Sequence, residues 1–225
     1  MKKRISLFIF LTALCFCLAG AFLNYPTVCA NSQPNVSLSN PRAIASNSTE
    51  LFVADTIEEN QSEYTIVHRI GESVTSYFLD FSVPGVTLDM CVNDNYIFLM
   101  QQDKILIYDY TLSDSPVKEF NQKGLLAFAV SGDYLFFAYT SNGFNYIGAF
   151  LYQQNELTAL NPYNYYSTQI RFLEAGQEGK AAVFFETESQ SFFQTIKVEQ
   201  SSVLAETPTN LPPDSFNGVI GIINY

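Results

Sequence analysis

The chain has 225 residues, of which 48% are hydrophobic and 15% aromatic, and its formal net charge is −11. That hydrophobic content supplies a packed core and excludes an intrinsically disordered chain. The 20 Phe and 14 Tyr residues favour the pleated surfaces of β-sheets. An acidic surface repels phosphate backbones, so we expect no nucleic-acid partner.

The N-terminal residues have the pattern of an export signal. Basic residues at positions 2–4 precede an apolar run at 5–23, and Val28 and Ala30 occupy the −3 and −1 positions of a cleavage site. We therefore predict a bacterial signal peptide over residues 1–30 and a secreted or cell-surface protein. Because the apolar run is longer than the usual signal core, an uncleaved segment that anchors the chain in a membrane is the alternative.

Residues 31–40 are predicted to form a polar linker. Without residues 1–30 the chain keeps 8 Lys and Arg against 22 Asp and Glu, which gives a net charge of −14. Cys91 is then the single cysteine, so no intramolecular disulfide can form. Its equivalents in the neighbouring repeats are alanines, which predicts a small residue of the core.

From residue 41 onward the chain lacks a helical period and repeats a pattern of strands. Short apolar runs are interrupted by Asn, Asp, Gly, Ser or Gln, which is typical of all-β proteins. Each repeat has an apolar strand, a polar turn, a second apolar strand and two further strands. The second strands are marked by equivalent phenylalanines: Phe52, Phe98, Phe136 and Phe184. Four strands in a unit of about 40–50 residues predict the blade of a propeller.

We therefore predict an all-β, propeller-like domain over residues 41–225, with a β-sandwich as the competing fold. Its expected parts are blades at about 41–82, 84–122, 124–161 and 166–208 and the first strand of a partial fifth blade at 216–225. Four blades could close into a ring with this last segment or with a strand near residues 36–39. The interpretation that we favour is a truncated piece of a larger propeller, because an exposed final strand leaves an unpaired edge.

The first repeat carries a more specific resemblance. Its matching residues are Pro41, Ala43–Ala45, Leu51–Thr56 and the pair Arg69 and Ile70. With these residues it resembles an NHL-type propeller repeat, whereas the later repeats keep only the strand plan. The resemblance implies a propeller that serves as a binding platform, and it carries over no catalytic residue.

Patterns for catalysis and metal binding are weak. His68 is the only histidine, which excludes histidine-rich zinc sites, and the sequence has no G-x-S-x-G nucleophile motif. Asp55, Glu58, Glu59 and Glu63 form an acidic segment without the spacing of a calcium loop. We therefore expect no catalytic residue, no metal and no cofactor.

A tyrosine-rich segment is the positive indication of a binding site. Tyr163, Tyr165 and Tyr166 lie between the third and fourth repeats, and such residues suit contacts with carbohydrate or peptide. We expect a non-enzymatic module that binds an extracellular protein or a glycan.

Two alternatives to this module stay open. One is a propeller hydrolase or lyase with a metal in its central channel, and the other is a truncated propeller without a function of its own. For the enzyme, the first strands of the repeats offer a mixed set of channel side chains: Arg42, Asp89, Arg171 and Glu174.

Overall fold

The computed structural model describes residues 38–71, 77–110, 115–154, 156–165, 169–177, 179–187 and 190–211. These residues belong to one compact unit, Val36–Tyr225. The predicted signal peptide, most of the predicted linker and the predicted partial blade at 216–225 lie outside the described residues. No helix in the described part of the chain has the length and hydrophobicity that a membrane crossing needs.

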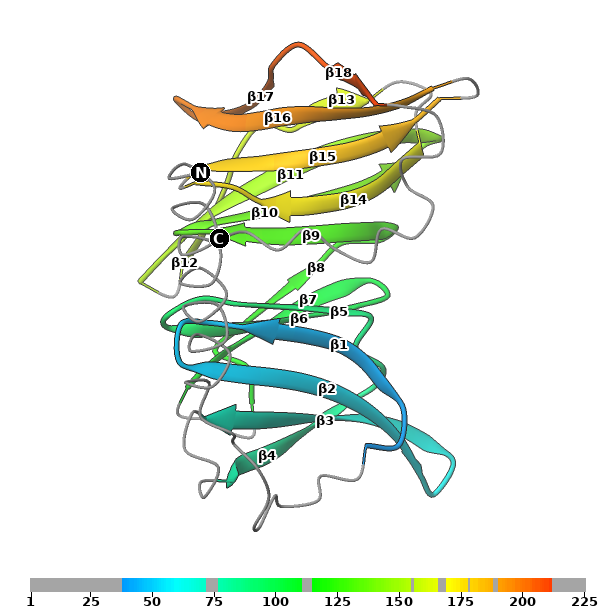
Figure 1. The fold of residues 1–225 in the computed structure, drawn as a ribbon, viewed down its shortest axis with the longest axis vertical. Coiled ribbons are helices and arrows are strands. Elements are labelled where there is room, and N and C mark those ends of the chain that lie inside the picture. The colour runs from blue at the N-terminus through cyan, green and yellow to red at the C-terminus, as the bar shows by residue number, and fades with distance from the viewer. Residues whose placement is uncertain are drawn as a thin grey trace, which may run out of the picture. The chain divides into compact units, whose positions relative to one another are not determined.

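Consecutive strands form the first two sheets, each in the order of the chain (Figure 1). Blade 1 consists of β1 (Pro41–Ser46), β2 (Glu50–Glu59), β3 (Ser62–Gly71) and β4 (Tyr77–Pro84). Blade 2 consists of β5 (Asp89–Val92), β6 (Tyr96–Gln101), β7 (Lys104–Asp109) and β8 (Lys118–Asn121). All neighbouring strands are antiparallel, as short turns between consecutive strands require.

Blades 3 and 4 each contain a fifth, short strand that the sequence did not predict. Blade 3 consists of β9 (Leu125–Ser131), β10 (Tyr134–Ser141), β11 (Phe144–Gln153), β12 (Glu156–Ala159) and β13 (Tyr163–Tyr165). Blade 4 consists of β14 (Gln169–Ala175), β15 (Lys180–Glu186), β16 (Ser191–Glu199), β17 (Ser202–Ala205) and β18 (Thr209–Leu211). In both blades two short outer strands pair with different parts of the same third strand.

Apolar side chains on both faces of the blades form the core. Alternate residues of a strand point to opposite faces, so one set packs on the following blade and the other on the preceding blade. We call these the forward face and the rear face. Buried clusters lie between blades 1 and 2, blades 2 and 3, and blades 3 and 4. The first strands of successive blades lie next to one another.

The marker phenylalanines identify the forward faces. Phe52, Phe98 and Phe136 are 0%, 1% and 0% exposed, and each belongs to the cluster shared with the following blade. Burying a phenyl group this fully contributes about 2–3 kcal/mol. The prediction of an all-β chain with about four blades, marked by these residues, is confirmed.

The two ends of each blade carry different connections, because every sheet is built from consecutive antiparallel strands. The turn between the first and second strands lies at one end, which we call the seam end. The turn between the second and third strands lies at the opposite end, together with the linker to the next blade. We call this the hairpin end.

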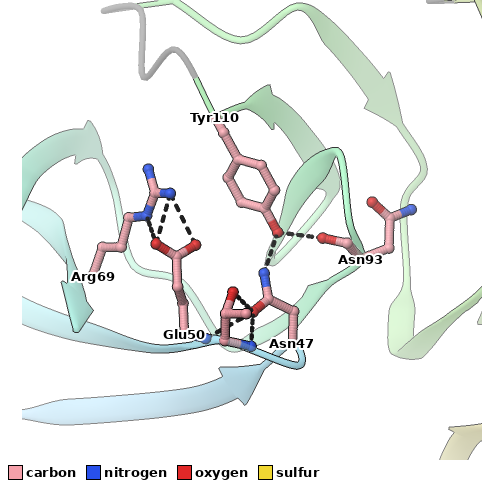
Figure 2. A network of polar contacts seen from close by, with 6 residues as sticks. Asn47, Glu50, Arg69, Asn93 and Tyr110 are labelled. Carbon is pink, nitrogen blue, oxygen red and sulfur yellow. Dashed lines mark hydrogen bonds and ion pairs between the residues drawn. The ribbon is translucent and has the colours of Figure 1, made fainter. Parts of the chain in front are cut away.

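At the seam end, Tyr110 joins the first turns of blades 1 and 2. The Asn47 side-chain oxygen accepts hydrogen bonds from the backbone N–H groups of Thr49 and Glu50, at 2.9 and 2.8 Å, which fixes the turn of blade 1. The Asn47 amide donates to the Tyr110 hydroxyl at 3.0 Å. That hydroxyl in turn donates to the backbone carbonyl of Asn93 in the turn of blade 2 (Figure 2).

An ion pair lies against the same tyrosine. Arg69 donates hydrogen bonds of 2.7 and 2.9 Å to the two carboxylate oxygens of Glu50 (Figure 2). The guanidinium carbon of Arg69 lies 5.1 Å from the ring centroid of Tyr110 and 5.9 Å from that of Phe52. Such cation–π contacts contribute about 0.5–2 kcal/mol. The seam therefore holds a paired charge over two aromatic rings.

Similar links join the remaining first turns. The Asn93 side-chain amide donates to the backbone carbonyl of Gly132 in blade 3, at 3.4 Å. The hydroxyl of Ser131 donates to the carbonyl of Gln177 in blade 4, at 2.6 Å. The first turns of the four blades are thus connected in series by side chains.

Candidate functional site

A pocket of about 550 Å³ opens at the hairpin end, between blades 1 and 2. Blade 1 contributes its second hairpin, and blade 2 contributes its own hairpin and the linker that precedes β5. The lining residues are Glu63, Val86, Leu88, Gln101, Gln102, Asp103, Lys104 and Asn121. Its volume lies within the range of small-ligand sites.

Hydrogen bonds hold the linker that forms one wall of this pocket. Gly85 has a φ of +89°, a conformation that favours glycine, and its N–H donates to the Glu63 carbonyl at 2.8 Å. The Thr65 hydroxyl donates to the Gly85 carbonyl at 2.9 Å and accepts from the Thr87 N–H at 2.8 Å. The Gln101 amide donates to the carbonyl of Pro84 at 2.8 Å. The wall is therefore formed before any ligand binds.

The chemistry of the lining favours a neutral or cationic ligand. Glu63 and Asp103 supply carboxylates, whereas the cation of Lys104 lies 3.8 Å from the carboxylate of Glu119. Amide side chains add donors and acceptors, and Leu88 is 50% exposed and adds an apolar surface. Polar groups beside an apolar surface are a general feature of ligand pockets.

The structure places the predicted binding tyrosines in different surroundings. Tyr165 is 5% exposed, packs in the cluster between blades 3 and 4, and donates a hydrogen bond of 2.5 Å to the Gln194 side chain. Tyr163 is half-buried, with its ring centroid 5.0 Å from that of Tyr165. Tyr166 lies outside the described residues. Tyr165 thus has a packing role, and a binding role for Tyr163 stays a prediction.

The acidic residues of blade 1 also differ from one another in their exposure to solvent. Asp55 is 2% exposed, and its carboxylate accepts hydrogen bonds from the backbone N–H groups of Ser39 and Asn40, at 2.8 and 2.5 Å. It therefore fixes the chain that enters β1. The His68 Nε2 atom lies 3.9 Å from the Asp55 carboxylate, and both side chains are buried. Glu58 and Glu59 are exposed.

Two of the channel side chains that the enzyme alternative names, Asp89 and Glu174, are carboxylates on first strands. Burial raises the pKa of Asp89 to about 6, the Met90 N–H bond of 2.8 Å lowers it in part, and nearby Glu174 raises it. The same burial and the same carboxylates raise the pKa of the Cys91 thiol, which disfavours a reactive thiolate. Arg171 is engaged by Glu186 at 2.8 Å. The described residues contain no group of three or more His, Cys, Asp or Glu side chains placed to hold a metal ion.

Comparison with solved structures identifies the architecture. The chain matches a protein of Bacteroides uniformis proposed to be a 6-phosphogluconolactonase, with a TM-score of 0.58 and 11% identity over 80% of this chain and 60% of that chain. It matches the WD40 domain of Neurospora crassa Pan2 with a TM-score of 0.51 and 14% identity, over 75% of this chain and 54% of that one. The fold is that of a β-propeller.

A third match is KlAtg21 in complex with the coiled coil of AgAtg16, with a TM-score of 0.52 and 10% identity, over 77% of this chain and 70% of that one. The chain spans between about half and three fifths of the length of several of the solved propellers it matches. No protein-family model matches it. No functionally curated protein matches it either. At these identities the likeness establishes the fold alone, and the NHL-type assignment of the first repeat stays a prediction.

Proposed function

We propose that this protein is a non-enzymatic propeller, secreted or held at the cell surface, that binds an extracellular protein or a glycan. The pocket between blades 1 and 2 carries the proposal, because it combines a preformed wall, amide groups and exposed Leu88. Its amide and carboxylate groups offer hydrogen bonds for the recognition of a ligand. The first repeat acts as an NHL-type unit of this platform.

The acidic lining narrows the class of partner. A ligand with a phosphate or carboxylate group would meet Glu63 and Asp103 at the pocket, and burial of like charges is unfavourable. A neutral glycan, or a peptide segment that contains Lys or Arg, avoids this cost. The KlAtg21 complex with a coiled coil supports the view that a propeller of this general architecture can hold a protein segment.

A binding screen tests the proposal. An array of neutral and acidic glycans and a library of cationic, neutral and acidic peptides are presented to the purified chain. We expect retention on neutral glycans or cationic peptides, and loss of that retention in Leu88→Ser with Asp103→Asn. The matched control is Leu126→Ser, an exposed leucine of β9 outside the pocket. Retention that survives the pocket variant but is lost in Tyr163→Ser would move the site to the predicted tyrosines.

The proposed export has its own test. Mass spectrometry of the protein recovered from outside the producing cells is expected to show a chain that starts at Asn31, because cleavage is predicted after Ala30. A chain that retains residues 1–30 in the membrane fraction would support the anchored alternative instead.

The enzyme alternative rests on the likeness to the Bacteroides uniformis protein and on the raised pKa of Asp89. Hydrolysis of 6-phosphogluconolactone by the purified chain, with and without added divalent cations, tests it directly. We expect no turnover, because the acidic pocket disfavours a phosphorylated substrate. Turnover that disappears in Asp89→Asn would contradict the non-enzymatic proposal.

A further inference from the structure

A row of partly exposed side chains crosses the rear face of blade 3 at the hairpin end. Tyr139 on β10 follows Phe137 by two residues and shares its face, and the Phe137 side chain packs in the cluster between blades 2 and 3. Tyr139 lies opposite Leu125 on β9 and opposite Tyr146 on β11. Tyr146 in turn lies opposite Asn164 on β13. The row thus takes one side chain from each of four neighbouring strands.

A continuous stack of aromatic rings leads from the core into this row. The ring of Phe137 lies over Gly148, where an added Cβ atom would come within 2.4 Å of it. Tyr139 stacks on Phe137 with ring centroids 5.5 Å apart and an interplanar angle of 29°. Tyr146 stacks on Tyr139 at 5.2 Å and 19°. The glycine at position 148 permits this stack, because a larger residue there would displace the ring of Phe137.

The tyrosines of this row stand where blades 1 and 2 have side chains that hold the backbone. Asp55 and Gln101 occupy the position of Tyr139, three residues after their marker phenylalanines. Each of them binds the backbone that precedes its own blade. The hydroxyls of Tyr139 and Tyr146 make no hydrogen bond within the described part of the chain. Burial raises the pKa of Tyr139, and the nearby Tyr146 raises it further, so this hydroxyl stays protonated and remains a donor at neutral pH.

Asn164 ends the row with a polar atom that the fold does not satisfy. It lies between Tyr163 and Tyr165, which pack in or against the cluster on the forward side, so the alternation of the strand places Asn164 on the rear face. Its side-chain oxygen is buried and has no hydrogen-bond partner among the described residues. A buried acceptor in this state destabilises the fold. A ligand that donates a hydrogen bond to it would remove this cost.

We propose that this row binds a neutral saccharide. Phe144, which is 41% exposed and lies two residues before Tyr146 on β11, extends the aromatic surface towards the tip of the hairpin. The C–H faces of a pyranose ring pack on such side chains, while its hydroxyls accept hydrogen bonds from the tyrosines and donate to Asn164. No charged side chain belongs to the row, so an ionised ligand would find no ion-pair partner in it. From Tyr139 to Asn164 the row covers two strand spacings, about 10 Å, which is comparable to the length of a disaccharide.

Calorimetric titration of the purified chain tests this site. The probes are linear tetrasaccharides derived from cellulose, mannan, xylan and chitin. We expect at least one of them to bind, and Tyr146→Ala to weaken that binding about tenfold because a stacking ring is lost. Tyr146→Phe keeps the ring and should retain most of the affinity. The matched control is Leu204→Ser, which changes an exposed leucine of β17 in blade 4 and should bind the probe like the wild type.

Asn164→Leu separates binding from folding. It removes the unpaired oxygen with little change in side-chain size, so we expect the affinity for the saccharide to fall severalfold while the midpoint of thermal unfolding stays the same or rises. A lower midpoint with unchanged affinity would show that Asn164 serves the fold, and it would overturn the proposal. Circular dichroism verifies that each variant keeps its sheets.

Leu88→Ser distinguishes this site from the pocket between blades 1 and 2, because no side chain of the row lines that pocket. An affinity that falls in Leu88→Ser but not in Tyr146→Ala assigns the saccharide to the pocket, which overturns the row as a site and supports the proposed function. The proposal is also overturned if no tetrasaccharide binds at millimolar concentration. Binding of a proline-rich peptide in place of the saccharides, lost in Tyr146→Ala, overturns it as well.

Discussion

The seam end and the hairpin end of the blades use hydrogen bonds for different purposes. At the seam end the bonds that Asn47, Asn93 and Ser131 donate cross from one blade to the next. At the hairpin end, Asp55 binds the backbone that enters the first strand of its own blade, and Gln101 binds the end of β4, where the linker between blades 1 and 2 begins. One end therefore sets how the blades lie against each other, and the other holds loops in place and leaves a pocket open. A side chain can be replaced with the smallest loss of stability where no neighbouring blade contacts it.

The largest expected effect is at the hairpin end of blade 1. Asp55→Ala leaves the N–H groups of Ser39 and Asn40 without their acceptor in a partly buried place. We predict a loss of about 2–3 kcal/mol in the free energy of unfolding, measured by chemical denaturation. Hydrogen exchange should become faster in β1 and stay unchanged in blades 3 and 4. Glu58→Ala, at an exposed position of the same strand, is the control. Faster exchange throughout the chain would contradict the prediction that Asp55 acts only on its own blade.

Tyr110→Phe tests the seam end. Removal of the hydroxyl leaves the Asn47 amide and the Asn93 carbonyl without their shared partner, whereas the ring stays available to Arg69. We predict a loss of about 1–2 kcal/mol, accompanied by faster exchange in the turns of both blades 1 and 2. Faster exchange in blade 2 alone would show that the hydrogen bond between the two blades contributes nothing to their stability.

Asp89 on β5 provides a test that depends on pH. Its pKa is raised from 3.8 to about 6, so the folded chain binds this proton more tightly than the unfolded chain does. Stability from this group is therefore complete below about pH 4 and is lost as the pH rises through 6. Asp89→Asn keeps an acceptor for the Met90 N–H and should stabilise the protein by about 1 kcal/mol at pH 7.5 and little at pH 4. Exposed Asp94→Asn should show no such difference between the two pH values.

The smallest effect on stability is expected in the pocket. Asp103→Asn keeps an acceptor for the Gly124 N–H, which lies 3.3 Å from the Asp103 carboxylate, and Leu88→Ser changes a side chain that is 50% exposed. Each should therefore alter the free energy of unfolding by less than about 0.5 kcal/mol. Retention of the ligand classes in the screen should nevertheless fall. A thermal melt of both variants beside the wild type measures the first quantity. A large loss of stability would mean that the hairpin end also supports the fold.

Much of the strand plan could be predicted because each blade repeats one pattern of apolar alternation and turn residues. Phe52, Phe98 and Phe136 occupy the same position in three sheets and are buried there. The short strands β13 and β18 were missed because three residues carry too little alternation to be distinguished from a loop. Tyr165 was assigned to a loop for that reason, although pairing with β11 places it in the core.

The pocket could not be predicted from the sequence. Glu63, Leu88, Asp103 and Asn121 are of ordinary types and lie far apart in the chain. Strand pairing within blade 2 brings the last three together, and the packing of blade 1 adds Glu63. The role of Asp55 was equally hidden, because a buried carboxylate that binds backbone N–H groups looks like any acid of a solvated segment. A sequence shows which side chains are charged, but it does not show which groups they bind in the folded chain.

The order of strands in the sheets also bears on how the molecule is made. Because every sheet uses consecutive strands, each blade depends on short-range contacts that form quickly, and a nascent chain can complete its blades from the N-terminus onward. At each stage the last finished blade presents its marker phenylalanine, first Phe52, then Phe98, then Phe136, as the surface on which the next blade assembles. Synthesis that pauses between blades therefore prolongs the exposure of one such aromatic face. The nascent chain is most prone to stick to other chains at those moments, and a chaperone would have most to gain by binding there.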